Sequence, residues 1–232
     1  MQLIEVSVTG VRAAAITLKA PDTAMRIILF PMLHIGSAGY YHSVTARLTN
    51  CDLIVTEGIS GASVTAWALT LAYRIPAHNR RLGLNVQSVD YAGLGIPVVR
   101  PDMTARQFRA SWRSVPLLHR LAIWFLVPPF AVSFALLGTR RTLSRYLSTE
   151  DLPDPVEAQA RQLSPQLHEA LLDHRDRLLT HCLASIHEAR RSDDIDVAVV
   201  YGAAHMPAVT HELLRRYGYR PRTAEWLTVV DF

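Results

Sequence analysis

Residues 26–37, RIILFPMLHIGS, and residues 196–207, DVAVVYGAAHMP, decide the fold. Each stretch begins with an apolar run typical of a strand covered on both faces, and then passes a histidine into a helical pattern. A second strand-like run closes each unit, CDLIVTEG at 51–58 and WLTVV at 226–230. The sequence therefore predicts an α/β fold. Its central sheet, mostly parallel or mixed, is built from two related strand–helix–strand halves.

Length and composition agree with one globular domain over residues 1–232. Half of the residues are hydrophobic and 19% are charged, which excludes a chain that is disordered as a whole. The two cysteines cannot form a disulfide framework. The opening MQLIEVSV has neither the basic nor the apolar region of a signal peptide, so we expect a cytoplasmic protein, with membrane association as an alternative.

The middle of the chain has a different charge balance from the rest. Residues 74–145 carry eleven arginines against two acids, and the longest uncharged run, Leu121 to Thr139, lies among them. We expect residues 104–150 to be a helical insertion or lid. Its apolar run predicts a buried helix pair interrupted at Pro128-Pro129, or a homodimer face. Alternatively, residues 116–145 lie on an anionic membrane surface, or the run spans the membrane. We expect no nucleic-acid partner, because the arginines are not interleaved with a stacking platform.

Polar side chains follow the predicted strands where ligands bind to α/β sheets. His34 and His205 occupy equivalent strand-to-helix turns, and Glu57 ends a buried strand. Imidazole is a common metal ligand, and a carboxylate can ligate a metal or activate water. We therefore predict a divalent ion held by His34 and His205, with Glu57 as a further ligand or as the base.

Three further side chains are candidates for roles at this site. Arg175 lies on a predicted helix from about Pro165 to Arg191, and we expect it to stabilise an oxyanion. Its neighbour Asp176 points about 100° away around a helix, so the two side chains cannot face the same direction. Solvated helix charges are the alternative for this stretch, and a substrate carboxylate is an alternative partner for Arg175. Tyr40 and Tyr41 follow His34 closely and are predicted to bind substrate, with a core position as the alternative. Asp102 is predicted to be a helix cap.

These strings, taken in order, resemble the TraB/TIKI family. The resemblance rests on MLHIGS at 32–37, CDLIVTEG at 51–58, HRD at 174–176 and GAAH at 202–205. The family has two GxxH motifs, of which the second is intact here, whereas Pro31 stands in place of the first glycine. The wider group includes erythromycin esterase-like and ChaN-like haem-binding proteins. The resemblance implies a metal-dependent protease that uses Mn or Co, with Zn or Fe as alternatives.

Together these observations predict a hydrolase of amide or ester bonds with a small-molecule or peptide substrate. Serine-hydrolase, Walker, dinucleotide-binding and HExxH motifs do not occur in the sequence. Two rival functions stay open: a haem or small-ligand binding protein on the same fold, and a membrane-surface interaction protein whose site has decayed.

Overall fold

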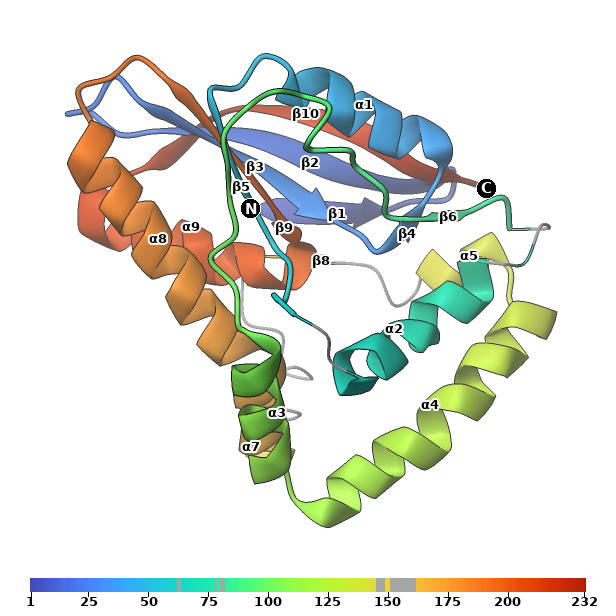
Figure 1. The fold of residues 1–232 in the computed structure, drawn as a ribbon. Coiled ribbons are helices and arrows are strands. Elements are labelled where there is room, and N and C mark those ends of the chain that lie inside the picture. The colour runs from blue at the N-terminus through green and yellow to red at the C-terminus, as the bar shows by residue number, and fades with distance from the viewer. Residues whose placement is uncertain (62–63, 78, 80–81, 145–148, 151–161) are drawn as a thin grey trace.

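The computed structural model describes residues 1–61, 64–77, 79, 82–144, 149–150 and 162–232 (Figure 1). It confirms the predicted α/β fold with a mixed central sheet. The strands follow the order β7-β5-β9-β3-β2-β1-β8, and β10 pairs with β2. These strands are β1 (Gln2–Val6), β2 (Gly10–Lys19), β3 (Arg26–Met32), β5 (Leu53–Thr56), β7 (Val98–Val99), β8 (Thr149–Glu150), β9 (Asp196–Gly202) and β10 (Arg220–Asp231). A short pair, β4 (Ile35–Gly36) and β6 (Asn85–Val86), lies apart from this sheet.

The centre of the sheet is parallel. Strand β9 lies between β3 and β5 and pairs in parallel with both, so the carboxyl ends of these three strands meet at one edge. The other half is antiparallel, because β2 pairs with β1, β3 and β10 in that manner. The closing strand of the second half, β10, therefore joins the sheet through the N-terminal hairpin rather than beside β9.

Alternating side chains of the central strands fill two cores. On β9, Ala198 and Val200 face the core under helix α1, whereas Val197, Val199 and Tyr201 face the core under α8 and α9. All five side chains are buried, so apolar and polar residues do not alternate along this strand. Helix α1 (Ala38–Leu48) covers one face, and α8 (His174–Arg190) and α9 (Met206–Tyr217) cover the other (Figure 1).

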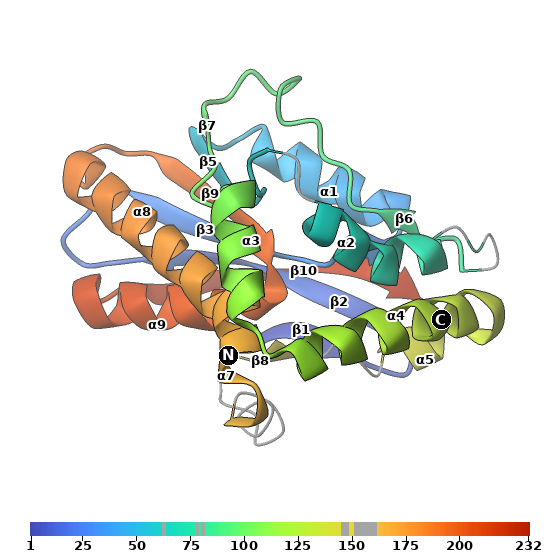
Figure 2. The same cartoon turned by 60° about the horizontal axis from the view of Figure 1, so that its bottom comes forward.

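The middle of the chain forms a helical layer beside the sheet edge. Its helices are α2 (Val64–Ala77), α3 (Ala105–Ser114), α4 (Leu117–Leu137) and α5 (Arg140–Ser144). Figure 2 shows α4 running along the outer side of α2. Trp112, Val115 and Ala170 make a small separate core that ties α3 to the segment before α8. The predicted helical insertion therefore begins near residue 105, and α2 joins its layer.

Helix α4 differs from the predicted buried helix pair in two ways. It continues through Pro128 and Pro129, although each proline removes one backbone hydrogen bond. It does pack against α2, but only 11% of its most apolar 18-residue window is buried. Among the described residues it is the one helix long and apolar enough to cross a membrane, judged by length and composition. The prediction of a mostly buried helix is therefore wrong for this monomer.

The predicted long helix near Pro165–Arg191 has an irregular first third. It comprises α7 (Pro165–His168), the π-helical turn η1 (Glu169–Asp173) and α8. A π turn carries an extra residue, so it rotates everything that follows it around the helix axis. The segment with this altered register begins at His174, next to two polar residues of the site described below.

Side-chain caps begin helices α1 and α3, and a glycine ends α9. Ser37 accepts a hydrogen bond from the Tyr40 N–H at the start of α1, and Thr104 and Gln107 form a capping box on α3. Helix α9 ends at Gly218, whose φ of 71° lies in the left-handed region. A Cβ added there would meet only ordinary contacts, so the requirement for glycine is conformational.

We expect Gly218→Ala to lower the free energy of unfolding by about 1–2 kcal/mol, because the left-handed conformation disfavours a residue with a Cβ. Gly39→Ala, in the first turn of α1 and with only an ordinary contact of its Cβ to the Ser37 hydroxyl at 3.9 Å, is the control and should raise stability by up to about 0.5–1 kcal/mol. Urea unfolding measures both changes. Equal effects of the two substitutions would contradict the assigned conformations.

Candidate active site

The parallel strand ends bring the predicted site residues to one place. Glu57 directly follows β5, Gly202 ends β9, and His34 lies two residues beyond β3. One carboxylate oxygen of Glu57, Oε2, accepts a hydrogen bond from the Gly202 N–H at 3.3 Å. The other, Oε1, lies 3.8 Å from Nδ1 of His34. The sheet edge thus joins both halves of the fold at Glu57, as the strand pattern predicted.

His34 lies on the solvent-exposed side of the site. Its side chain is 48% exposed, and its ring stacks on Tyr73 of α2 with centroids 4.7 Å apart. The backbone carbonyl of His34 accepts a hydrogen bond from the Gln87 N–H. The imidazole is therefore held by stacking on one face and stays accessible to a ligand.

Arg175 reaches the same site from α8 and is bound mainly by Asp102. Its Nε and Nη2 donate to the two carboxylate oxygens of Asp102 at 2.8 and 2.7 Å, and Nη2 also lies 3.4 Å from Oε2 of Glu57. No hydrogen bond between described residues uses its Nη1. A forked guanidinium–carboxylate pair fixes both groups in one plane, so Arg175 has a defined orientation.

The Asp102 side chain is completely buried and stays ionised. Burial by itself would raise the pKa of this carboxyl. The hydrogen bonds and charge of Arg175, helped by the N–H groups of Gly58 and Met103, outweigh burial and lower the pKa below its ordinary value. The same carboxylate raises the pKa of Arg175 against the effect of burial. Asp102 is therefore a structural anion that fixes Arg175 beside Glu57.

His205 forms a second pair with Asp176. Its Nδ1 lies 2.6 Å from Oδ1 of Asp176, and its side chain is only 4% exposed. No hydrogen bond between residues in the described part of the chain occupies Nε2. A carboxylate on Nδ1 selects the tautomer in which Nε2 is free to accept a proton or bind a metal. This is the arrangement of an oriented base.

Tyr201 packs between these two pairs. Its ring meets His205 edge-on at 5.4 Å, and the Arg175 guanidinium lies 5.9 Å from its centroid. Its hydroxyl donates to the carbonyl of Pro101, the residue before Asp102. Burial raises the pKa of this phenol, so it remains a hydrogen-bond donor and a spacer.

Glu57 and His205 face each other across Gly202. A Cβ built on Gly202 would lie 3.5 Å from Oε2 of Glu57 and 3.5 Å from Cδ2 of His205. Gly202 has φ −51° and ψ 139°, which any residue adopts. Glycine is therefore not needed for the backbone here. Its effect is to leave a methyl-sized space between the carboxylate and the imidazole.

Comparison with family models, curated proteins and solved structures found no match for this chain.

Tyr40 and Tyr41 lie in the core below the site and do not form its surface. Both side chains are buried, and their hydroxyls donate to the carbonyls of Pro31 and Leu33 at 3.0 and 2.9 Å. They thus hold the backbone that leads to His34. The structure matches the core alternative for these tyrosines and gives them no contact surface for substrate.

Two important residues of the site were assigned to other roles from the sequence. Asp102 was predicted to be a cap, and Asp176 was given no role at the site. The rule that neighbours diverge by about 100° holds, but the two directions from α8 lead to different parts of one site. Arg175 turns to Asp102 and Glu57, and Asp176 turns to His205. The signal for Asp102 was its position just after a strand end.

The predicted divalent ion meets a partial donor set. His34, Glu57 and His205 are of the right chemical types, but the described residues contain no group of three His, Cys, Asp or Glu side chains arranged to hold a metal ion. An ion held by all three side chains would need them arranged differently from this. The chemical steps proposed below are accordingly assigned to the chain's own residues.

We expect Asp102→Asn to lower the free energy of unfolding by about 3–5 kcal/mol, because it leaves the buried Arg175 without its counter-charge. Glu169→Gln, which removes an exposed partner of Arg177, is the control and should cost less than about 1 kcal/mol. Denaturant unfolding at neutral pH measures both.

The pH dependence of the same variant is a second readout. Since the pKa of Asp102 is lowered in the folded state, its stabilisation is complete above the ordinary value of 3.8 and is lost as pH falls through the folded value. The stability gap between the native protein and Asp102→Asn should therefore narrow below about pH 4. A gap that stays constant from pH 7 to pH 3 would contradict the ionised, paired state of Asp102.

Proposed function

We propose that this chain is a hydrolase of amide or ester bonds. The observation that carries the proposal is the Asp176–His205 pair facing Glu57 across the space above Gly202. An oriented imidazole beside a carboxylate and an arginine is the set of groups that water attack on a carbonyl requires. The resemblance to the TraB/TIKI family supports the same reaction class.

In this proposal His205 is the general base. Its Nε2 takes a proton from water as the water oxygen attacks the substrate carbonyl carbon. Asp176 keeps the imidazole in the required tautomer and stabilises the imidazolium that forms. The imidazolium then returns the proton to the leaving amine or alkoxide, so the net result is the addition of one water across the cleaved bond.

In this proposal Glu57 positions the attacking water, and Arg175 stabilises the negative charge that develops on the carbonyl oxygen. Oε2 of Glu57 is held by the Gly202 N–H and lies near Arg175, which leaves Oε1 to accept a hydrogen bond from the attacking water. The N–H groups on Nη1 of Arg175 can donate to the oxyanion of the tetrahedral intermediate. Because Asp102 fixes the guanidinium, little reorientation is needed during the reaction.

A divalent ion is the alternative within this proposal: if His34 and His205 held one, Nε2 of His205 would be a ligand and Glu57 would be the base. Such an ion would polarise the carbonyl or lower the pKa of bound water. Elemental analysis after exposure to Mn²⁺ or Co²⁺, with a His34→Ala/His205→Ala variant beside it, tests this part. About one ion per chain, lost in the variant, would support it. No ion in either protein would remove the metal and leave the roles of His205 and Glu57 to be tested separately.

We expect His205→Ala and Glu57→Gln to lower kcat/KM for hydrolysis by at least 100-fold, since each removes a group that acts on the water. The assay is release of nitrophenol from p-nitrophenyl esters and of nitroaniline from p-nitroanilides. Glu169→Gln, in the π turn η1 before α8 and outside the site, should retain native activity. Hydrolysis that survives both substitutions would refute the proposal.

Gly202→Ala tests the geometry without removing any functional group. The backbone conformation accepts alanine and the new methyl meets only ordinary contacts, so we expect a change in unfolding free energy below about 1 kcal/mol. The methyl would lie against Oε2 of Glu57 and Cδ2 of His205, beside the two atoms assigned to the water, Oε1 and Nε2, so kcat should fall at least tenfold. Unchanged kcat in a folded Gly202→Ala protein would show that water does not react at that position.

A further inference from the structure

The outer face of α4 carries a continuous apolar surface that no described part of the chain covers. Helix α4 touches α2 along a seam that includes Ile123, Val127 and Ala131, where the two helices enclose a small cavity of about 50 Å³. Apart from this seam, nearly the whole circumference is apolar and exposed. The exposed large side chains are Leu117, Leu118, Leu121, Trp124, Phe125, Leu126, Phe130, Val132, Leu136 and Leu137.

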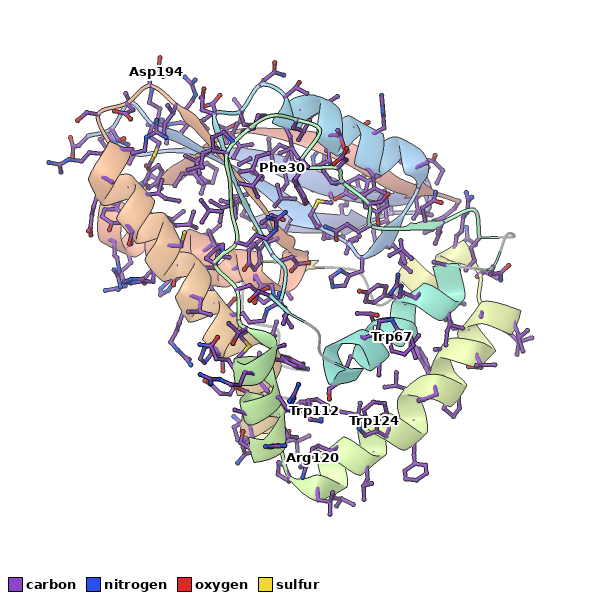
Figure 3. The ribbon with its side chains drawn as sticks, viewed as in Figure 1. Phe30, Trp67, Trp112, Arg120, Trp124 and Asp194 are labelled. Atoms are coloured by element: carbon purple, nitrogen blue, oxygen red, sulfur yellow. The ribbon has the colours of Figure 1, made fainter. Side chains whose placement is uncertain are left out.

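Exposed aromatic side chains occur on both helices of this layer. Phe125 of α4 is 73% exposed, and Trp67 of α2 is 56% exposed. Trp124 of α4 lines the cavity against α2 and is still 42% exposed; Figure 3 shows Trp67 projecting from α2 and Trp124 from α4. Soluble monomers rarely expose apolar patches of this extent unless the patch binds something. Tryptophan in particular is enriched where a protein meets the interface of a lipid bilayer.

The positive charge on both sides of α4 favours a negatively charged partner. From Met103 to Thr149 the chain carries seven arginines and no acidic residue. Arg106, Arg109 and Arg113 are exposed on α3, directly before α4, and Arg141 is exposed directly after it. A basic border around an apolar helix matches an anionic lipid surface, where each arginine contributes about 1 kcal/mol. A symmetric dimer through this face would instead bring like charges together.

The folded domain holds α4 at both ends. Before the helix, Trp112 and Val115 are buried in the small core with Ala170. After it, Arg140 donates to the carbonyls of Leu82 and Asp231. A spanning helix must place its ends on opposite sides of a bilayer, so α4 in this fold can only lie along the surface.

From this arrangement we infer that α4 embeds its outer face in an anionic lipid surface and anchors the domain there. This inference does not depend on the proposed hydrolase activity. It requires only the exposed apolar face, the arginine border and the anchored helix ends.

Vesicle flotation tests the inference with the whole 232-residue chain. We expect binding to vesicles of phosphatidylcholine with about 30% phosphatidylglycerol to exceed binding to pure phosphatidylcholine at least tenfold. Binding to the anionic vesicles should weaken as the salt concentration rises, because salt screens the attraction between the arginines and the lipid. Phe125→Ser/Leu136→Ser should reduce binding at least tenfold. Val8→Ser, which changes a side chain that is even more exposed but lies on the N-terminal hairpin, is the control and should bind normally.

The arginine border is tested separately. Arg106→Gln/Arg109→Gln should weaken binding to the anionic vesicles, whereas Arg220→Gln/Arg222→Gln, which removes the same charge from the exposed start of β10, should not. Equal binding to both vesicle types would overturn charge-directed docking. A stable dimer in light scattering that Phe125→Ser/Leu136→Ser dissociates, together with no vesicle binding, would assign the face to a second copy of the chain instead.

Discussion

The buried pair of Asp102 and Arg175 connects the separate parts of this fold. Asp102 stands in the loop between β7 and α3, Arg175 on α8, and Glu57 at the end of β5. A fully buried carboxylate is tolerable only when it is paired and hydrogen-bonded, and Asp102 meets this condition with Arg175 and two backbone N–H groups. The position of α8 relative to the strand ends is therefore fixed by charge as well as by packing.

Much of the frame was predictable because it depends on local patterns. The apolar runs of β3, β5 and β9 identified the buried strands, which the structure confirms. His34, Glu57, Arg175 and His205 were predicted as site residues from strand ends and from the family resemblance. The structure places all four around one sheet edge, and their chemical roles stay predictions.

The remaining features depend on contacts between distant segments. No local sequence pattern predicts that Asp102 pairs with Arg175, 73 residues away. The same is true of the pair of Asp176 and His205. Tyr40 and Tyr41 follow His34 closely in the sequence, but their side chains point into the core and not toward the site. The length and apolarity of α4 could be predicted from the sequence. Its exposure could not, because the burial of α4 depends on how much of its surface α2 covers.

The π turn at Glu169–Asp173 has a consequence for how this site tolerates change in chain length. The extra residue adjusts the register between Ala170, in the small helical core, and Leu179 and Leu183, in the core beneath the sheet. Removing one residue there would turn α8 by roughly a quarter of a circle relative to α7. Arg175 and Asp176 would then be misaligned together, so this short segment is less tolerant of deletions than of substitutions.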